Sequence, residues 1–120
     1  MSKKETALGA HVMLALSERG AVLFRNATTV AWVGRTIYQQ GRDVSLANAA
    51  RIEAGLCVGS SDLIGWTHDG RFLAVELKTK GVRITPEQQR FTDAVNRAGG
   101  VGIIAYTVES AVEQYEERVK

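Results

Sequence analysis

The sequence predicts an α/β sandwich with a mixed central β-sheet flanked by helices. Three observations predict it: helical and strand patterns alternate, a capped helix lies between two strands late in the chain, and the strand after that helix is almost wholly apolar. A helix between two strands favours a parallel crossover, and an apolar strand is typical of a sheet covered on both faces. The length of 120 residues fits one domain with one core.

The first third of the chain predicts one helix and two strands. Apolar residues recur at helical spacing over residues 3–19, with Ser2 as a candidate N-cap and Gly20 as the stop. Residues 21–25 and 28–33 are rich in Val, Phe, Thr and Trp, which favours strands.

Residues 38–56 allow two interpretations. Residues 45–55 could form a short capped helix. The same segment could instead be a loop that leads into a strand near residues 52–57. The pattern does not choose between them.

The second half of the chain is more regular. Residues 63–67 and 71–78 predict two strands. Thr85, Pro86 and Gln88 then form a helix start, because threonine caps, proline fits the first turn and Gln88 completes a capping box. That helix stops at a pair of glycines, and two elements follow it: an apolar strand at 101–107 and a helix at 109–118.

The composition is that of an ordinary soluble protein, with 45% hydrophobic and 23% charged residues. No apolar run reaches the ~18–20 residues of a membrane helix, and the start of the chain lacks the apolar block of a signal peptide. Cys57 is the single cysteine, so we expect neither an intrachain disulfide nor a zinc site, and a reducing cytoplasm is expected. The net charge of +2 permits a nucleic-acid partner without requiring one.

Three charged residues stand out around the hairpin predicted at residues 63–78. Alternate residues of a strand share a face, so Glu76 and Lys78 are neighbours on one face. A two-residue turn would send the Asp62 carboxylate to the other face. A three-residue loop with Gly70 in the left-handed conformation pairs Asp62 with Glu76, and we favour this register, although a bulge near Gly65 would give the same result.

Two opposed carboxylates repel each other unless a cation lies between them. Magnesium prefers oxygen ligands and is commonly held by one or two carboxylates together with substrate phosphate and water. Lys78 would then lie beside the metal, where an ammonium stabilises charge that develops on a phosphate. Asp62, Glu76 and Lys78 therefore predict hydrolysis of a phosphodiester. The alternative is that Glu76 and Lys78 form an ordinary solvated ion pair and that Asp62 caps a strand.

Three segments, GSSDLIG, FLAVELKTKG and ITPEQQRFTDAVNRAGG, resemble the VRR-NUC (virus-type replication-repair nuclease) family of the PD-(D/E)XK nuclease superfamily. The resemblance runs from about residue 5 to residue 106 and is strongest over residues 59–100. It implies a restriction-endonuclease-like fold and Mg²⁺- or Mn²⁺-dependent cleavage of branched DNA. The chain resembles the stand-alone type of bacteriophages and bacteria, which implies a homodimer that resolves Holliday junctions in the cytoplasm.

The resemblance also implies roles for individual residues. Asp62 and Glu76 would be metal ligands, the main-chain carbonyl of Leu77 would be a further ligand, and Lys78 would be the catalytic lysine. Glu5 matches a glutamate of the first helix that completes many such sites. Its alternative role is in the capping box of the first helix.

Two further positions bear on the resemblance. Gln88 matches the glutamine of the helix after the catalytic strand, near the active site, and its alternative role is again capping. Ser61 stands where the superfamily has proline before the aspartate. Because that proline only shapes the backbone, its replacement removes no ligand.

Several basic residues are candidates for contact with DNA. Arg25 and Asn26, followed by Arg35, resemble a stretch of the family that could contact phosphate. Lys80 and Arg83 follow the catalytic strand and could meet the DNA backbone. The alternative is that all four basic side chains are simply solvated.

Two rival functions fit the same residues. One is a DNA-binding or assembly module of this fold without activity, which the intact Asp62, Glu76 and Lys78 disfavour. The other is a nuclease specific for flaps or single strands, which the sequence does not separate from a junction-resolving enzyme. Trp32 and Trp66 are expected in the core or at an interface rather than as platforms for bases.

Overall fold

A computed structural model describes residues 2–27 and 29–120. The chain divides into two compact units, one formed by Met1–Asn26 with Val58–Lys120 and the other by Ala27–Cys57. The first unit is an α/β structure with a mixed sheet flanked by helices, as predicted. That residues 1–120 form a single domain stays a prediction.

The first unit holds seven elements: α1 (Lys3–Ser17), β1 (Val22–Arg25), β4 (Leu63–Trp66), β5 (Phe72–Leu77), α2 (Pro86–Arg97), β6 (Val101–Ala105) and α3 (Val108–Arg118). The sheet order is β1-β4-β5-β6. The strands β1, β4 and β5 are antiparallel neighbours, whereas β6 runs parallel to β5 after the crossover through α2. The predicted parallel crossover is therefore confirmed.

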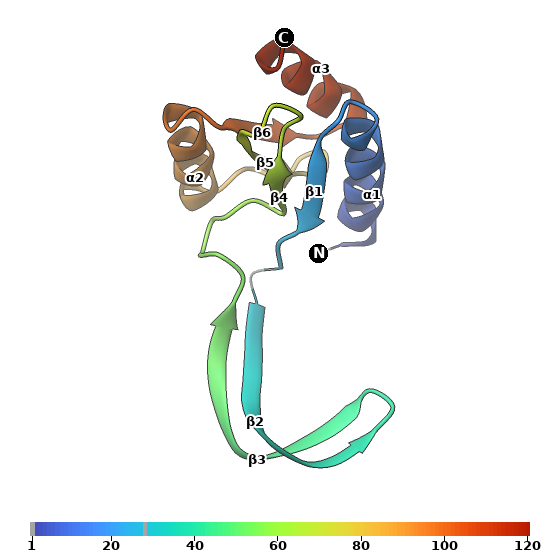
Figure 1. The fold of residues 1–120 in the computed structure, drawn as a ribbon, viewed down its shortest axis with the longest axis vertical. Coiled ribbons are helices and arrows are strands. Elements are labelled where there is room, and N and C mark those ends of the chain that lie inside the picture. Colours follow the sequence, from blue (N-terminus) through green and yellow to red (C-terminus); the bar gives the residue numbers. More distant parts are fainter. Residues whose placement is uncertain (1, 28) are drawn as a thin grey trace. The chain divides into compact units, whose positions relative to one another are not determined.

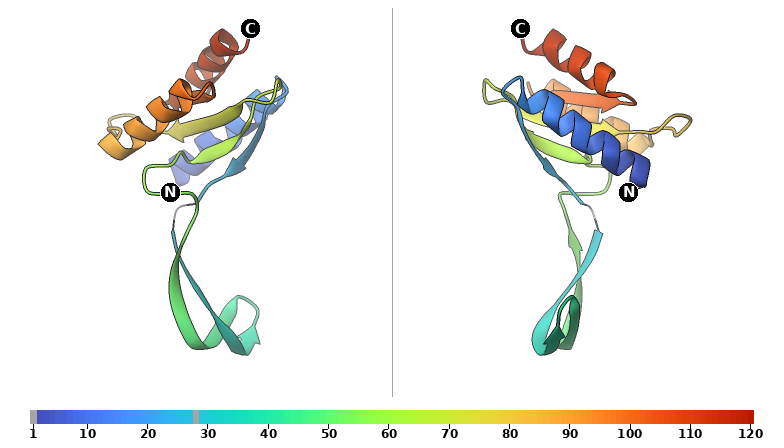
Figure 2. Two further views of the ribbon diagram at one scale, coloured as in Figure 1. Left: turned by 60° about the vertical axis from the view of Figure 1, so that its left-hand side comes forward. Right: turned by 90° about the vertical axis from the view of Figure 1, so that its right-hand side faces the viewer.

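Helices cover both faces of this sheet (Figures 1 and 2). The core lies on the face of α1 and α3, where Leu16 and Tyr115 pack with buried sheet residues such as Leu73 and Val75. α2 packs on β5 and β6 from the other face. There the Gly102 N–H donates to the side-chain oxygen of Asn96 at 2.8 Å. Odd-numbered residues of β5 thus face the core, and even-numbered ones face the side of α2.

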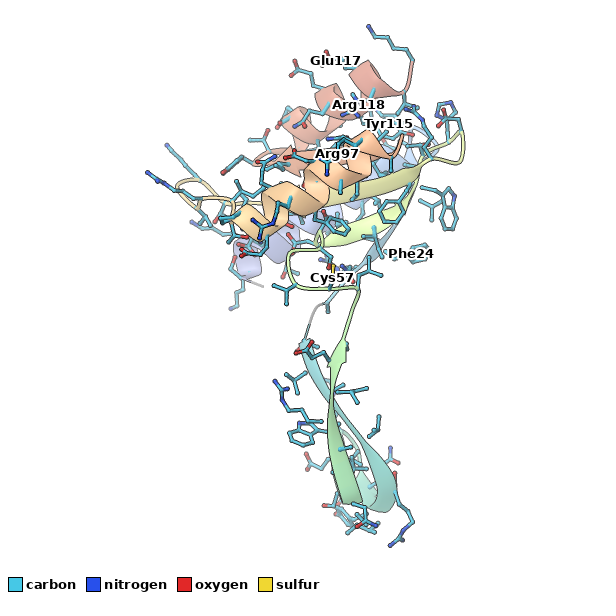
Figure 3. The ribbon with its side chains drawn as sticks, turned by 90° about the vertical axis from the view of Figure 1, so that its left-hand side faces the viewer. Phe24, Cys57, Arg97, Tyr115, Glu117 and Arg118 are labelled. Carbon is cyan, nitrogen blue, oxygen red and sulfur yellow. The ribbon has the colours of Figure 1, made fainter. Side chains whose placement is uncertain are left out.

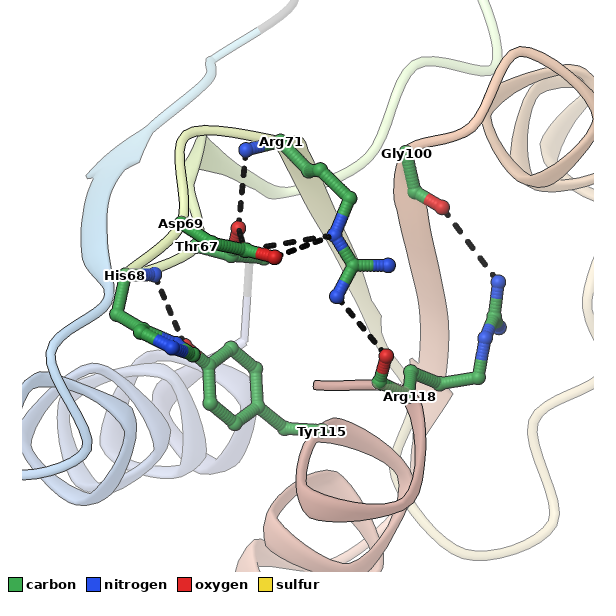
Figure 4. A network of polar contacts seen from close by, with 7 residues as sticks. All are labelled: Thr67, His68, Asp69, Arg71, Gly100, Tyr115 and Arg118. Atoms are coloured by element: carbon green, nitrogen blue, oxygen red, sulfur yellow. Dashed lines mark hydrogen bonds and ion pairs between the residues drawn. The ribbon is translucent and has the colours of Figure 1, made fainter. Parts of the chain in front are cut away.

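A polar network holds the turn between β4 and β5 (Figure 4). The Thr67 hydroxyl donates to the Asp69 carboxylate and accepts from the Arg71 N–H at 3.0 Å. The Arg71 guanidinium donates to the main-chain carbonyl of Arg118 at 2.9 Å, and that of Arg118 donates to the Gly100 carbonyl at 3.5 Å. The turn is thereby tied to the end of α3 and the start of β6.

The second unit is a two-stranded antiparallel ribbon of β2 (Thr29–Gln40) and β3 (Asp43–Ala54). Register shifts interrupt the pairing near Gly34 and Ile37, and Figure 2 shows the ribbon strongly twisted. None of the described residues of β2 or β3 is buried.

The ribbon settles the two interpretations of residues 38–56. The helix at 45–55 is wrong, because this segment pairs with β2 along most of its length. The strand expected near 52–57 lies earlier and is longer, and it ends at Ala54. The strand expected at 28–33 continues to Gln40, and Thr28 lies outside the described residues. Within the residues that the structure describes, no helix has the length and apolar character needed to cross a membrane.

Candidate active site

The register of the β4–β5 hairpin places the two acidic residues opposite each other. Leu63 pairs with Val75, so the next position outward sets Asp62 against Glu76. Gly70 has φ +84°, in the left-handed region, and the Thr67 N–H donates to the Arg71 carbonyl at 2.8 Å. The three-residue loop and its register are therefore confirmed, and no bulge is needed to bring the acids onto one face.

Asp62 lies just before β4 and is half-buried. Its Oδ2 atom accepts a hydrogen bond from the main-chain N–H of Leu77 at 2.9 Å. This contact bridges the two strands and fixes one carboxylate oxygen. Since a carboxylate oxygen has two lone pairs and Oδ1 is a second oxygen, Asp62 keeps the capacity to bind a cation.

Glu76 is the most unusual side chain of the site, because it is a carboxylate only 2% exposed. The Lys78 ammonium lies 3.7 Å from its Oε1 atom, while Oε2 is buried without a hydrogen-bond partner. The pKa of Glu76 is raised from 4.5 to about 8, chiefly by burial and next by the charge of Asp62 and a hydrogen bond with it, while the charge of Lys78 opposes the rise. At neutral pH Glu76 therefore holds a proton that a cation would have to displace.

The donor set suits a divalent cation. Two carboxylates face each other, one has a buried oxygen without a partner, and oxygen ligands are those that Mg²⁺ and Mn²⁺ prefer. Among residues 2–27 and 29–120, however, no three His, Cys, Asp or Glu side chains group to hold a metal ion. Glu5 therefore does not complete a three-acid cluster with Asp62 and Glu76, although its charge contributes to the raised pKa of Glu76. Its catalytic role stays a prediction.

The raised pKa of Glu76 predicts that the free energy of unfolding depends on pH. Between about pH 4.5 and pH 8 the unfolded chain releases this proton and the folded chain keeps it, so the contribution of Glu76 to the free energy of unfolding falls as pH rises. Glu76→Gln is neutral at every pH, so in EDTA the variant should gain stability over the parent as pH rises, levelling off above about pH 8. Each pKa unit is worth about 1.4 kcal/mol, which limits the gain to a few kcal/mol.

Urea denaturation at several pH values measures the difference between parent and Glu76→Gln. Glu113→Gln, at an exposed glutamate of α3, is the control and should show no such trend. A parent–variant difference that stays constant from pH 5 to pH 8 would contradict the buried, protonated state of Glu76.

Asn26 clamps the segment that leads into Asp62, a contact that the sequence did not reveal. Its side-chain amide donates to the Ser60 hydroxyl at 2.8 Å and to the Ser61 carbonyl at 2.9 Å. Its main-chain N–H donates to the Asp62 carbonyl at 2.8 Å. Contact of the Arg25-Asn26 stretch with phosphate stays a prediction. In the structure Asn26 extends the pairing of β1 and β4 and fixes the backbone of a candidate ligand.

Asn26→Ala keeps the main-chain hydrogen bond and removes the two from the side chain. We expect cleavage to fall roughly 10- to 100-fold, the range for groups that orient metal ligands, and the Mg²⁺ concentration at half-maximal rate to rise. Asn96→Ala is the matched control, because Asn96 clamps Gly102 in the same manner in a different part of the sheet. Equal Mg²⁺ dependence in Asn26→Ala and the parent would show that Asn26 has a structural role alone.

Gln88 has the capping role that the sequence offered as its alternative. Its Oε1 atom accepts from the Thr85 N–H at 2.9 Å, and its own N–H donates to the Thr85 hydroxyl at 3.2 Å. The α2 start nevertheless lies beside the loop before Asp62, because a Cβ on Gly59 would lie 2.7 Å from the backbone of Glu87. A further role for Gln88 in catalysis stays a prediction.

The basic residues expected to contact DNA are dispersed. Lys80 and Arg83 are exposed in the loop between β5 and α2, directly after the acid pair. Arg25 reaches α1 instead, where its guanidinium donates to the Thr6 carbonyl at 3.2 Å. Arg35 is exposed on β2 in the ribbon unit. Contact with DNA stays a prediction for all four.

The tryptophans do not lie in the core, and the alternative expected for them, a position at an interface, stays a prediction. Trp32 is 59% exposed and Trp66 is 48% exposed. Trp66 lies on β4, on the sheet face that carries Asp62 and Glu76. Alternation along a strand predicts which face a side chain is on, but it does not predict whether a helix covers that face.

The comparison with known families agrees with this geometry. No curated protein matches the chain. The model of the VRR-NUC domain family matches residues 14–110, which include Asp62, Glu76 and Lys78. Since the match covers most of the 120 residues, the chain belongs to the VRR-NUC domain family and has a nuclease-type function that implies binding to DNA.

Proposed function

We propose that the protein is a divalent-metal-dependent endonuclease that hydrolyses phosphodiester bonds of branched DNA. The opposed pair of Asp62 and Glu76 with Lys78 beside it carries this proposal. A family of nucleases supplies the reaction class. The two carboxylates and the adjacent ammonium supply a place for a cation and a phosphate.

The side chains have distinct tasks in this mechanism. Asp62 and Glu76 would hold Mg²⁺ or Mn²⁺, with the Leu77 carbonyl as a further ligand, and the ion would supply Lewis-acid chemistry toward the phosphate and the attacking water. Glu76 would have to lose its proton to serve as a ligand, because its raised pKa keeps it protonated at neutral pH. Lys78 stabilises the negative charge that develops on the phosphate oxygens, because its ammonium is buried and already oriented by Glu76 at 3.7 Å.

A homodimer would bring two such sites to a four-way junction. The ribbon supports this part of the proposal, because a two-stranded sheet without a core is marginally stable by itself. It also exposes a set of large apolar residues: Val30, Trp32, Val33, Ile37, Tyr38, Val44 and Ile52. A second copy would cover such residues.

Cleavage of labelled DNA tests the function. A panel of four-way junction, fork, flap, single strand and blunt duplex is incubated with Mg²⁺, with Mn²⁺ and with EDTA. We expect cutting of branched substrates with either metal and none in EDTA. Binding without cutting under every condition would favour an inactive DNA-binding module, and cutting in EDTA would exclude the metal mechanism.

Sedimentation velocity tests the dimer separately. The parent should sediment as a dimer, and the double variant Val33→Ser with Ile52→Ser should shift it toward the monomer. A monomeric parent at concentrations that cleave junctions would contradict the dimer while leaving the nuclease intact.

A further inference from the structure

The sheet face that carries the acid pair continues into exposed aromatic residues. Along β1, β4 and β5 the pairing sets Phe24 beside Ile64, and Trp66 beside Phe72. Because paired residues share a face and alternate residues repeat it, these four side chains lie on the same face as Glu76. We call Phe24, Trp66 and Phe72 the aromatic patch.

The aromatic patch is open to solvent. Phe24 is 53% exposed, Trp66 is 48% exposed and Phe72 is 43% exposed. The rings of Phe24 and Trp66 form a tilted pair with centroids 5.7 Å apart, so two of the three side chains already support each other. Figure 3 shows the Phe24 ring standing clear of the sheet. The opposite face of the same strands, by contrast, is buried against the core at Leu63 and Leu73.

The patch and the acid pair lie on the same face of the sheet. The row of Phe24 is two residues from the row of Asp62 and Glu76, a spacing of about 7 Å along a strand. Phe72 is four residues from Glu76, or roughly 13 Å along the strand. A DNA strand with a phosphate at the acid pair therefore reaches the patch within a few nucleotides.

The chemistry of the patch suits unpaired bases. Stacking on an aromatic ring does not depend on the base, and it is worth ~1–3 kcal/mol per base in proteins that bind single strands. A base within a duplex already stacks on its neighbours and does not present its face. Three rings beside a phosphate site thus favour a substrate in which the bases next to the cut are unpaired.

We propose that the aromatic patch binds unpaired bases of the DNA strand next to the phosphodiester held at Asp62 and Glu76. The protein would thereby select flaps, forks and opened junctions over uninterrupted duplex. This inference rests on the proposed nuclease function for its choice of ligand, and it goes beyond it by giving the substrate class a physical origin in Phe24, Trp66 and Phe72.

Tryptophan fluorescence in EDTA tests binding without cleavage. The chain has 2 tryptophans, so Trp32→Phe leaves Trp66 as the single tryptophan and serves as the parent. We expect a short poly-dT strand to quench its emission and a blunt duplex to leave it nearly unchanged. Emission that poly-dT does not alter, but that shifts with protein concentration, would overturn the proposal and assign the patch to contact between copies.

Affinity for labelled poly-dT completes the test. In the Trp32→Phe parent, Trp66→Ala should weaken binding roughly 10-fold, whereas Trp66→Phe, which keeps an aromatic ring, should stay within about threefold. Leu14→Ala is the control, because Leu14 is a 60% exposed apolar residue of α1, away from the patch. Equal affinity of Trp66→Ala and the parent would overturn the proposal.

Cleavage rates separate this inference from the proposed function. With Mg²⁺, Trp66→Ala should lose the preference for a flap over a blunt duplex while Lys78 remains in place to cut. If the parent cuts and Trp66→Ala keeps the same preference, the nuclease stands and the patch has no role in selection. If the parent binds poly-dT through Trp66 but cuts nothing, the patch stands and the nuclease proposal fails.

Discussion

Lys78→Ala is expected to abolish DNA cleavage and to leave DNA binding unchanged. The Lys78 side chain is only 10% exposed and lies 3.7 Å from Glu76, so its ammonium is held in a site where water screens charge weakly. Loss of a group that stabilises developing charge lowers cleavage rates about 100- to 1,000-fold. Single-turnover cleavage of a labelled junction measures the rate, and binding to the same junction in EDTA measures affinity.

Lys80→Ala is the matched control for this prediction. Lys80 is two residues further along the chain and exposed, so its removal should weaken binding slightly and change the single-turnover rate by no more than a few fold. A Lys78→Ala variant that cuts within tenfold of the parent rate would refute the role of the ammonium. Equal losses in both variants would show that positive charge in general, and not the buried amine, is needed.

Asp62→Asn has the second large effect, on metal affinity. In the parent the Leu77 N–H donates to the Asp62 carboxylate at 2.9 Å. The side-chain amide oxygen of the variant can accept the same hydrogen bond, so the hairpin should remain folded. The substitution removes one of two negative charges that would bind the cation. We expect metal affinity to fall at least about 100-fold, more than for groups that merely orient ligands, with a matching loss of cleavage.

Isothermal titration with Mn²⁺ measures this loss directly. Asp93→Asn is the control, because Asp93 is an exposed acid of α2 that accepts a hydrogen bond from Gln89. Its titration should match that of the parent. An unchanged titration for Asp62→Asn would remove Asp62 from the ligand set, whatever happened to cleavage.

Local signals predict much of the fold. The capping box of Thr85 and Gln88 marks the start of α2. The three-residue loop that ends at Gly70 sets the pairing register of β4 and β5. The sequence leaves residues 45–55 undecided, because their local pattern is compatible with both a helix and a strand. Pairing with the strand β2 decides the outcome. The choice between helix and strand depends on contacts with residues that are distant in the sequence, which a short stretch of sequence does not contain.

The candidate site also has one part that local sequence predicts and another part that it does not. Asp62, Glu76 and Lys78 follow from strand alternation and one turn, because all three lie on a single hairpin. The clamp by Asn26 joins residues 34 and 35 positions apart, so no local pattern reveals it. Trp66 lies outside the core for a related reason. Its face is predictable from the strand, whereas the packing of α2 on β5 and β6, which leaves that tryptophan 48% exposed, is not.

A crystal of the protein soaked in Mn²⁺ tests the central claim most directly. We expect an anomalous peak between the carboxylates of Asp62 and Glu76, with the Leu77 carbonyl in contact and the Lys78 ammonium beside it. The Glu76 oxygen that is buried without a partner should become a ligand. A fully soaked crystal with Mn²⁺ bound elsewhere and no peak between these two residues would contradict the proposed active site.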